Sequence, residues 1–363
     1  MSVVYKKLED VCEILDSRRV PITAKDRKAG TYPYYGANGL QDYVADYIFD
    51  DELVLLAEDG GNFGSKERPI AYRVSGKCWV NNHAHVLKAK PNMHVDYLCY
   101  ALMFYDTEGL VNGATRQKLT QAAMRQMVIP YRDMTEQLQI IKKISQIVRS
   151  IEKRKEELQL LDQLVKSRFI ELFGEPLSNQ KGWQTMSIVE AAPIKSQRGN
   201  LADEVWLLNL DAVEAQTGTV LFKHRVQSGE INASTVYFTA ESVLYSKLRP
   251  YLNKVVMPDE DGVATSEMIP MCPLADRLNR AYLCYWLRSD AFVRHISEKV
   301  AGAKMPRVSM DYFRSLAIEM PPLELQEQFA AFVEQTDKSK LAVQKGLQEL
   351  EILKKSLMQQ YFG

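Results

Sequence analysis

The stretch that decides the fold reads TEQLQIIKKISQIVRSIEKRKEELQLLDQLVKSRFIELFG and covers residues 135–174. Its apolar residues recur at intervals of three and four, the period of an amphipathic α-helix with one narrow apolar stripe. Thr135 can cap the start of this helix, and Gly174 followed by Pro176 marks its end. We therefore predict a single helix of roughly 40 residues, on the order of 55 Å long at a rise of about 1.5 Å per residue.

A second helical run closes the chain after Pro321-Pro322 and contains Gly346, a residue type that lowers helix stability by about 1 kcal/mol relative to alanine. A stripe of this length must be buried, and the two helices of one chain are natural partners, so we expect an antiparallel coiled coil. The alternative is that each helix packs only on its own domain. Lys155 and Asp162 fall on the first stripe, where polar residues often fix the register. The apolar positions predicted for the interface are Ile141, Ile144, Val148, Ile151, Leu158, Val165, Phe169, Val343, Leu347, Leu350, Leu353 and Leu357.

The two helical runs belong to an internal repeat. The offset between copies is 191 residues at the proline before each helix and 189 at the terminal Phe-Gly, which predicts a two-residue slippage inside the helix. Upstream of the helices, Tyr97–Leu102 matches Tyr282–Leu287, Gly113-Ala114 matches Gly302-Ala303, and Lys118-Leu119-Thr120 matches Arg307-Val308-Ser309. At the helices, Pro130 matches Pro321, Glu136-Gln137 matches Glu327-Gln328, and Phe173-Gly174 matches Phe362-Gly363.

Each copy therefore holds a globular part followed by a helix. We predict globular domains at residues 1–130 and 175–320, helices at 131–174 and 321–363, and a pseudo-two-fold relation between the copies. Strand-like runs without a regular alternation of strand and helix indicate α+β domains. The clearest runs are Tyr47–Phe49, Leu53–Ala57 and His85–Leu87 in the first copy, and Val205–Leu208, Gly218–Phe222 and Ser242–Tyr245 in the second.

Several loops of both globular parts interleave basic, amide and aromatic side chains. Such side chains can form paired hydrogen bonds to base edges, and the basic ones also bind phosphates, so we take these loops as candidate DNA contacts. The first copy contributes Tyr34, Tyr35, Asn38, Asn62, Lys66, Arg68, Asn81, Asn82, His83, Arg116 and Lys118. The second contributes Lys195, Gln197, Arg198, Asn200, Lys223, His224, Arg225, Lys247, Arg249, Tyr251, Lys304 and Arg307.

Signatures of catalysis are missing. The chain has no phosphate-binding G-x-x-x-x-G-K-[ST] loop, no G-x-S-x-G elbow and no Asn-Pro-Pro-Tyr or Asp-Pro-Pro-Tyr segment. His83 and His85, with Glu58-Asp59 upstream, lack a third metal ligand, so we predict no metal site and no catalytic residues. This pattern indicates a targeting chain rather than an enzyme.

Composition is that of an ordinary globular protein. The 46 basic and 46 acidic residues give a net charge of zero, which counts mildly against a nucleic-acid binder without excluding one, because a basic face can be balanced elsewhere. Five scattered cysteines without a C-x-x-C pair argue against a disulfide framework or a zinc site and are most simply buried small hydrophobes. With no apolar stretch long enough for a signal peptide or a membrane helix, we expect the cytoplasm.

Taken together, these segments resemble the specificity subunit of type I restriction–modification systems. The resemblance covers nearly the whole chain. It is carried by Tyr34–Gly39, by Leu244–Pro250, and by the repeated proline, Glu-Gln and long helix that ends in Phe-Gly.

The resemblance implies two target recognition domains separated by an antiparallel coiled coil that sets the gap of a bipartite, asymmetric DNA site. It also implies two methyltransferase subunits that use S-adenosylmethionine to methylate adenine, and motor-nuclease subunits that use ATP and magnesium. The specificity chain itself is expected to bind no cofactor. Three alternatives stay open: a stand-alone nuclease or methyltransferase, a coiled-coil protein scaffold, and the specificity subunit of a related methyltransferase-based defence system.

Overall fold

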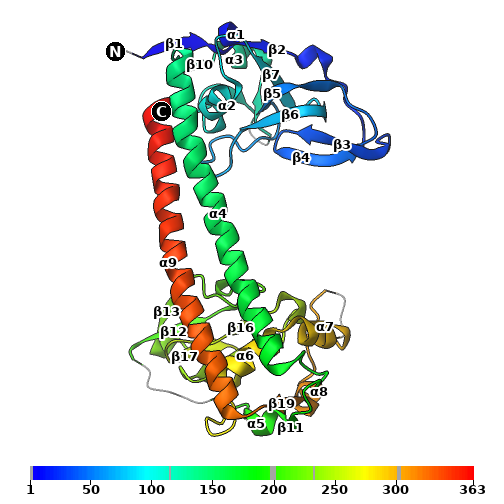
Figure 1. Cartoon of the computed structure of the whole chain (residues 1–363), viewed down its shortest axis with the longest axis vertical. Helices are drawn as coiled ribbons and strands as arrows, with labels where there is room; N and C mark the ends of the chain where they lie inside the picture. Colours follow the sequence, from blue (N-terminus) through cyan, green and yellow to red (C-terminus); the bar gives the residue numbers. More distant parts are fainter. Residues whose placement is uncertain (1–2, 114–115, 197–201, 232–233, 301–303) are drawn as a thin grey trace. The chain divides into compact units, whose positions relative to one another are not determined.

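The computed structural model describes residues 3–113, 116–196, 202–231, 234–300 and 304–363 (Figure 1). It divides into two compact units. Unit 1 contains the residues up to Lys155 together with Lys345–Gly363, and unit 2 contains Glu156–Gln344. Because the chain starts and ends in unit 1, that unit is built from both ends of the sequence.

Two long helices of 40 residues each, α4 (Met134–Phe173) and α9 (Leu323–Phe362), contribute to both units. The residue numbers of their first residues differ by 189, and so do those of their last residues. The same offset separates the preceding strands β10 (Val128–Tyr131) and β19 (Ala317–Met320). The predicted slippage inside the helix is therefore wrong. Pro130 aligns with Glu319 rather than Pro321, and the proline and Glu-Gln matches were chance similarities two residues out of register.

Unit 1 is built on a six-stranded sheet with the strand order β2-β7-β5-β6-β3-β4, flanked by the two-stranded pairs β1–β10 and β8–β9. Its other elements are β1 (Val4–Lys7), α1 (Leu8–Val11), β2 (Cys12–Ile14), β3 (Ala29–Gly36), β4 (Gly39–Val44), β5 (Phe49–Ala57), β6 (Ala71–Val80), β7 (Ala84–Ala89), α2 (Val95–Met103), β8 (Val111–Asn112), β9 (Lys118–Leu119) and α3 (Gln121–Gln126).

Strand β5 shows why this sheet lies at the centre of unit 1. Successive side chains of a strand point to opposite faces, and every side chain of β5 from Leu53 to Ala57 is buried. Val54 and Leu56 face a core that contains α2 and the start of α4, whereas Leu53 and Leu55 face a second core on the other side. The continuous apolar run Leu53–Ala57 therefore predicted this strand correctly. Of the predicted run Tyr47–Phe49, only Phe49 belongs to β5, because Tyr47 and Ile48 precede the strand.

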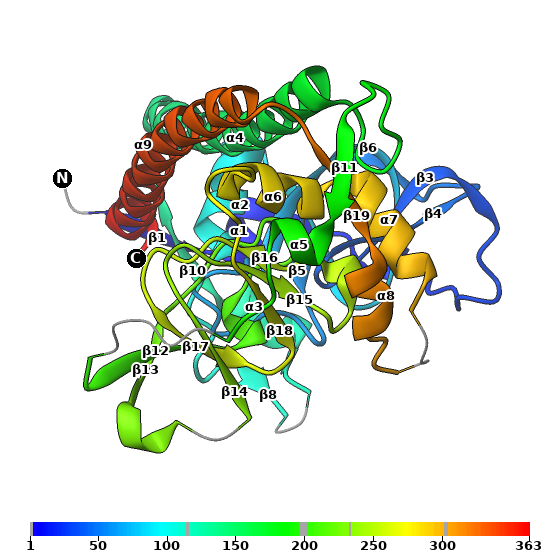
Figure 2. The same cartoon turned by 90° about the horizontal axis from the view of Figure 1, so that it is seen from below.

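Unit 2 repeats this plan with shorter sheets, in the strand orders β13-β12-β17-β14, β16-β15-β18 and β11-β19. Figure 2 shows β11 and β19 side by side. The elements are β11 (Gln184–Ser187), α5 (Ile188–Ala191), β12 (Glu204–Leu208), β13 (His224–Gln227), β14 (Thr235–Phe238), β15 (Val243–Ser246), β16 (Val255–Val256), β17 (Gly262–Thr265), β18 (Met268–Met271), α6 (Arg280–Arg288), α7 (Asp290–Glu298) and α8 (Met310–Ser315).

The predicted strand Gly218–Phe222 is wrong. Only Val220 forms an isolated bridge, to Val213. Gly218 has a φ of +67° in the turn between Glu214 and Thr219, and Leu221 and Phe222 are exposed. A left-handed glycine breaks the extended backbone that a strand requires.

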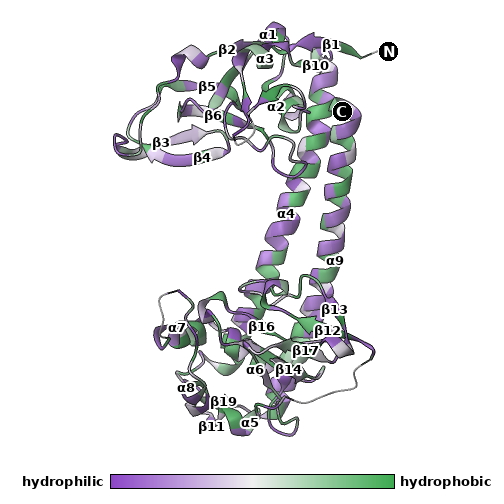
Figure 3. Cartoon of the chain, turned by 180° about the vertical axis from the view of Figure 1, so that it is seen from behind, coloured by the Kyte–Doolittle hydropathy of each residue, from purple (hydrophilic) through white to green (hydrophobic). Residues whose placement is uncertain are grey.

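Within each unit, α4 and α9 pair in antiparallel fashion. In unit 1 Lys155 forms an ion pair with Glu351, and in unit 2 Asp162 forms one with Lys340, at 3.5 and 2.6 Å. The two charged stripe positions thus bind the opposite helix. Figure 3 shows hydrophobic and hydrophilic residues alternating along both helices, as a one-sided stripe requires.

Most predicted stripe residues are buried or half-buried, but Leu353 is 46% exposed. The less exposed positions of α9 in this region are Leu350, Lys354 and Leu357, a spacing of four and then three. Lys354 therefore occupies the stripe, and Leu353 lies one residue outside it. On α4 the prediction missed Ile140, which is buried beside the half-buried Ile141.

A buried glutamine fixes the start of each helix to its globular part. Gln137 donates to the carbonyls of Asn92 and Arg132 and accepts from the His94 amide. Gln326 repeats all three bonds with Arg277, Pro321 and Asn279. At the other end of the helices, Phe362 packs against Tyr97 in unit 1, and Phe173 against Tyr282 in unit 2.

Candidate nucleic-acid interface

The central strand of each unit ends at the same kind of loop. In unit 1 the chain leaves β5 through Glu58 and Gly60, and in unit 2 it leaves β15 through Lys247 and Arg249. The amide of Leu119 donates to the Glu58 carbonyl at 2.8 Å, and that of Val308 to the Lys247 carbonyl at 2.9 Å. Leu119 and Val308 are again 189 positions apart. The two loops are therefore equivalent parts of the repeat.

We call the surface around the first loop edge 1, formed by Asn38, Asp59, His83, Arg116 and Lys118. Arg116 contacts Asp59 at 2.6 Å and lies 3.4 Å from the His83 ring nitrogen. Asn38 donates to the Gly60 carbonyl at 3.0 Å. The side chain of Arg116 remains 59% exposed, so it keeps donors available to a ligand while Asp59 fixes its direction.

We call the corresponding surface of unit 2 edge 2, formed by Lys247, Arg249, Tyr251, Lys304 and Arg307. Arg307, the counterpart of Lys118, binds both oxygens of Glu267, with its Nη2 2.9 Å from Oε1. These hydrogen bonds hold the pKa of Arg307 above its ordinary value. Tyr251 and Arg249 are exposed. Edge 2 therefore combines four basic side chains, of which Arg307 binds Glu267, with the exposed aromatic ring of Tyr251.

Arg249 has a left-handed backbone, with a φ of +49° and a ψ of +63°. Its amide donates to the Pro306 carbonyl, as the amide of Gly60 donates to the Gln117 carbonyl in unit 1. Gly60 also has positive φ, +69°, which costs glycine little. A non-glycine residue in this region costs on the order of 1 kcal/mol or more, and such strain is concentrated at functional sites. Arg249 thus keeps at edge 2 the left-handed conformation that Gly60 has at edge 1.

Two predicted contacts of unit 1 are wrong because their side chains are buried. Tyr34 is 1% exposed, and its hydroxyl donates to the Ile22 carbonyl. Asn81 is 4% exposed; its amide group donates to Gln41, and its oxygen accepts the amide proton of His83. Both residues support the fold near edge 1 instead of reaching a ligand. Sequence composition could not separate them from their exposed neighbours.

The remaining candidates of unit 1 stay predictions. Tyr35 and Asn62 are half-buried, and Asn62 donates to the Pro69 carbonyl. Lys66, Arg68 and Asn82 are exposed. Lys66 and Arg68 lie on the loop between β5 and β6, and Asn82 lies between β6 and β7.

In unit 2, Lys223 and Arg225 belong to a separate charged cluster. Lys223 binds Asp259 and Glu260, and Arg225 binds Glu260 at 2.7 Å. The hydrogen bonds from Lys223 hold the pKa of both carboxyl groups below their ordinary values. Both cations therefore bind acidic side chains, as Arg307 does at edge 2, and their contact with DNA stays a prediction.

His224 and Lys195 are exposed, and Lys304 is exposed at edge 2. Gln197, Arg198 and Asn200 lie outside the described residues, as do Ala114 and Gly302-Ala303 of the repeat.

Beneath edge 1 lies a charged cluster that the sequence did not reveal. Ligand atoms of Asp16, Glu58 and His85 lie within 4.8 Å of one another, so Asp16 supplies the third group that the metal hypothesis lacked. Arg19 and Lys118 already bind Glu58, at 2.6 and 3.2 Å, and His85 binds Asp16 at 2.6 Å. Because Arg19, Lys118 and His85 already contact the carboxylates, we interpret the cluster as a network of ion pairs and hydrogen bonds.

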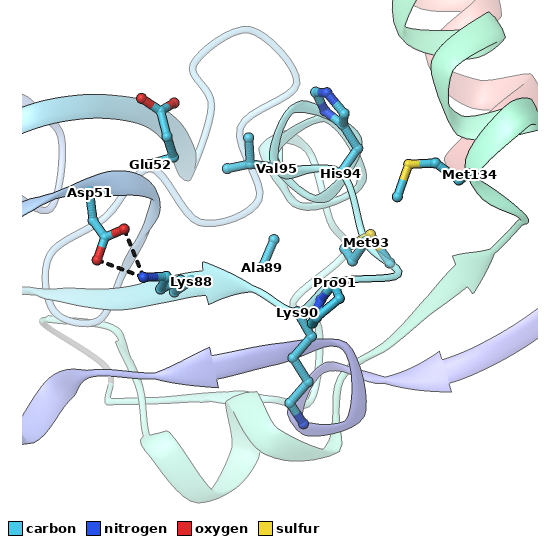
Figure 4. A pocket seen from close by; sticks show the side chains of 10 residues that line it. All are labelled: Asp51, Glu52, Lys88, Ala89, Lys90, Pro91, Met93, His94, Val95 and Met134. Atoms are coloured by element: carbon cyan, nitrogen blue, oxygen red, sulfur yellow. Dashed lines mark hydrogen bonds and ion pairs between the residues drawn. The ribbon is translucent and has the colours of Figure 1, made fainter.

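A shallow cavity of about 350 Å³ lies at the opposite end of β5 and β7 (Figure 4). Alanine, proline, methionine and valine side chains form its apolar wall. Its charged groups have partners: Asp51 binds Lys88 at 2.8 Å, and Lys90 donates to the Glu9 carbonyl. Asp51 and Lys90 are therefore held by neighbouring groups of unit 1.

The comparisons with known proteins agree with the duplicated plan. The family model described as the type I restriction modification DNA specificity domain matches twice, at residues 2–161 and 181–352. The chain belongs to the type I restriction–modification DNA specificity family. It is accordingly a chain that determines DNA specificity and carries two copies of the specificity domain, each with one of the two edges.

Individual relatives are distant or partial. A Haemophilus influenzae protein named as a type I restriction enzyme specificity subunit is 37% identical over 140 residues, which are 39% of this chain and 36% of the relative. The EcoDI specificity subunit of Escherichia coli is 21% identical over 84% of this chain and 75% of its own length. The solved specificity subunit from M. genitalium shares the fold, with a TM-score of 0.60, 13% identity, and coverage of 100% of this chain and 96% of that one.

None of the helices among the described residues combines the length and the apolar character that a membrane-spanning segment needs.

Proposed function

We propose that the chain reads a bipartite, asymmetric site on double-stranded DNA, with edge 1 contacting one half and edge 2 the other. The observation that carries this proposal is the equivalent position of the two edges in the repeat, each at the end of the central strand. Equivalent places in a repeat receive the same kind of ligand, while their different side chains select different sequences.

The chemistry of the edges suits DNA. Arginine and lysine bind phosphates and the acceptors O6 and N7 of guanine, whereas a carboxylate accepts from the amino group of cytosine. Edge 1 pairs Arg116 with Asp59, and edge 2 presents Arg249 from a constrained backbone. The two edges therefore differ in charge, since edge 1 contains two basic side chains with Asp59, whereas edge 2 contains four, of which Arg307 binds Glu267.

We further propose that the chain is a targeting subunit without catalysis of its own. In this proposal it assembles with two methyltransferase subunits and with motor-nuclease subunits. The resulting complex methylates adenine N6 with S-adenosylmethionine and cleaves DNA with ATP and magnesium. In this proposal all three cofactors are bound by the partner subunits.

The experiment is sequencing of the DNA methylated by the chain after co-purification with its methyltransferase subunit. We expect a bipartite motif, with a methyladenine in each half. Arg249→Ala should relax the half read by edge 2, at a cost of about 1–3 kcal/mol in discrimination. The matched control is Arg277→Ala. This arginine is exposed and lies on the loop after β18, at the end of that strand away from edge 2.

Other outcomes would overturn specific parts. If Arg249→Ala and Lys118→Ala both leave the motif unchanged, the edges do not read DNA. Failure of the chain to join a methyltransferase subunit would favour a protein scaffold, and methylation by the isolated chain would identify an enzyme.

A further inference from the structure

We propose that the buried pair His85–Asp16 is a positioning device that holds edge 1 in its DNA-reading arrangement, and that edge 2 has no such device. The inference rests on the proposed function of the edges. It concerns residues that do not themselves reach the surface, because His85 is 0% exposed and Asp16 is 7% exposed.

Both ring nitrogens of His85 contact acceptors. Nδ1 lies 2.6 Å from Asp16 Oδ2, and Nε2 lies 2.9 Å from the Leu119 carbonyl oxygen. The buried ring of His85 therefore bridges the Asp16 carboxylate and the Leu119 carbonyl.

Asp16 connects the His85 ring to two further segments. Its Oδ1 accepts the Val86 amide proton at 2.9 Å, and its Oδ2 accepts from the Gln121 side chain at 2.9 Å. Burial raises the pKa of Asp16, but the hydrogen bonds from His85 and Gln121 outweigh it, and the net pKa lies below the ordinary value. The pair thus ties the start of β7 to the segment that leads from β9 into α3.

A second ion pair continues the network to the surface. Arg19 binds Glu58 at 2.6 Å and donates to the Ala84 carbonyl at 2.8 Å. Glu58 precedes Asp59, and its carbonyl accepts the Leu119 amide. Lys118, which is half-exposed, also binds Glu58, so the network reaches the surface at edge 1.

Among the described residues of unit 2, the position equivalent to His85 holds an apolar side chain. His85 lies opposite Leu56 in the pairing of β7 with β5, and Ile269 lies opposite Tyr245 in the pairing of β18 with β15. Ile269 is buried in an apolar core. Edge 2 is therefore supported at this point by apolar packing, and a change at His85 should affect one half of the DNA site alone.

Removal of one member of the buried pair leaves the other without its hydrogen-bond partner, so the loops that supply the bonds rearrange. In Asp16→Asn and His85→Gln complexes we expect discrimination at the edge 1 half-site to fall about tenfold. Discrimination at the other half should stay within about twofold of the wild type. The double variant should be no worse than the poorer single variant, because the two residues act as a unit.

The control variant is His295→Gln in unit 2, a half-buried histidine whose ring contacts the Tyr312 hydroxyl. Gln121→Ala is a milder test in unit 1 in case the ion-pair variants do not fold, since Gln121 is an exposed helical residue whose loss removes one bond to Asp16. It should reduce discrimination at the same half-site by a smaller factor.

A second readout requires no DNA. Hydrogen exchange at the amides of Gly60 and Leu119, which bind across the edge 1 loops, should accelerate about tenfold in Asp16→Asn and stay unchanged in His295→Gln. If exchange accelerates but the wild-type complex methylates no bipartite motif, the positioning role stands and the proposed function fails. Equal losses at both half-sites, or unchanged exchange and discrimination in folded variants, would overturn the positioning role.

Discussion

Gln137→Met tests how the long helices are fixed to the globular parts. Gln137 is buried at the first turn of α4 and forms three side-chain hydrogen bonds, of 2.8, 3.1 and 2.8 Å. Methionine has nearly the same length and the same helix propensity, so the substitution removes the bonds with little change in packing or helix stability. It leaves the His94 amide and the carbonyls of Asn92 and Arg132 without their partner.

The magnitude follows from these three groups. A buried hydrogen bond contributes about 1–1.5 kcal/mol net, and the loss is larger where a backbone group remains unsatisfied. Three bonds give about 4 kcal/mol, from which about 1 kcal/mol is recovered by burial of the apolar methionine side chain. We therefore expect Gln137→Met to lower the free energy of unfolding by about 3 kcal/mol.

The assay is urea denaturation monitored by circular dichroism. A loss of this size lowers the urea concentration at the unfolding midpoint by about 1 M, if the free energy of unfolding falls by about 3 kcal/mol per M of urea. Gln326→Met should give a similar loss, because Gln326 repeats the same three bonds in unit 2. Gln139→Met, at an exposed position of α4, is the control and should change stability by less than about 0.5 kcal/mol. Losses below about 1 kcal/mol in both buried variants would refute the reasoning, since water would then be replacing the amide.

Two further predictions concern helix α9 and the thiols. Gly346→Ala should raise the free energy of unfolding by about 0.5–1 kcal/mol in the same denaturation assay, because the added methyl group would meet only Arg154, at 4.0 Å. A loss of stability would show that the interface between α4 and α9 is tighter there. Burial raises the pKa of Cys12 and Cys99 to about 12 and that of Cys78 to about 11. In the native chain at pH 8, iodoacetamide should therefore modify Cys272, which is half-buried, well before the others, as peptide mass spectrometry would show; equal labelling of all five would contradict the buried placement.

The part of the fold that is local in sequence could be predicted. The span of both long helices follows from a 3.6-residue period that is visible in any short window, and β5 follows from a continuous apolar run. The repeat could also be found, because both copies keep the same residue types at the helix ends. Its register could not, because short proline and Glu-Gln matches are too common to fix an alignment.

The candidate site was predicted only as a set of polar loops. Arg116 and Arg307 look alike in sequence, as do Tyr34 and Tyr35, but only the folded chain shows that Arg307 binds Glu267 or that Tyr34 is buried. The same limit hid Asp16, whose partner His85 is distant along the chain.

By itself, then, the sequence determined the α+β class, the duplication and the two long helices, because these depend on periodicities and propensities that act between near neighbours. The tertiary structure alone decided which loops meet at each edge, which charges are neutralised and which polar side chains are buried. Electrostatic partners and burial depend on distances in space between residues that lie far apart in sequence, and those distances exist only once the strands have paired.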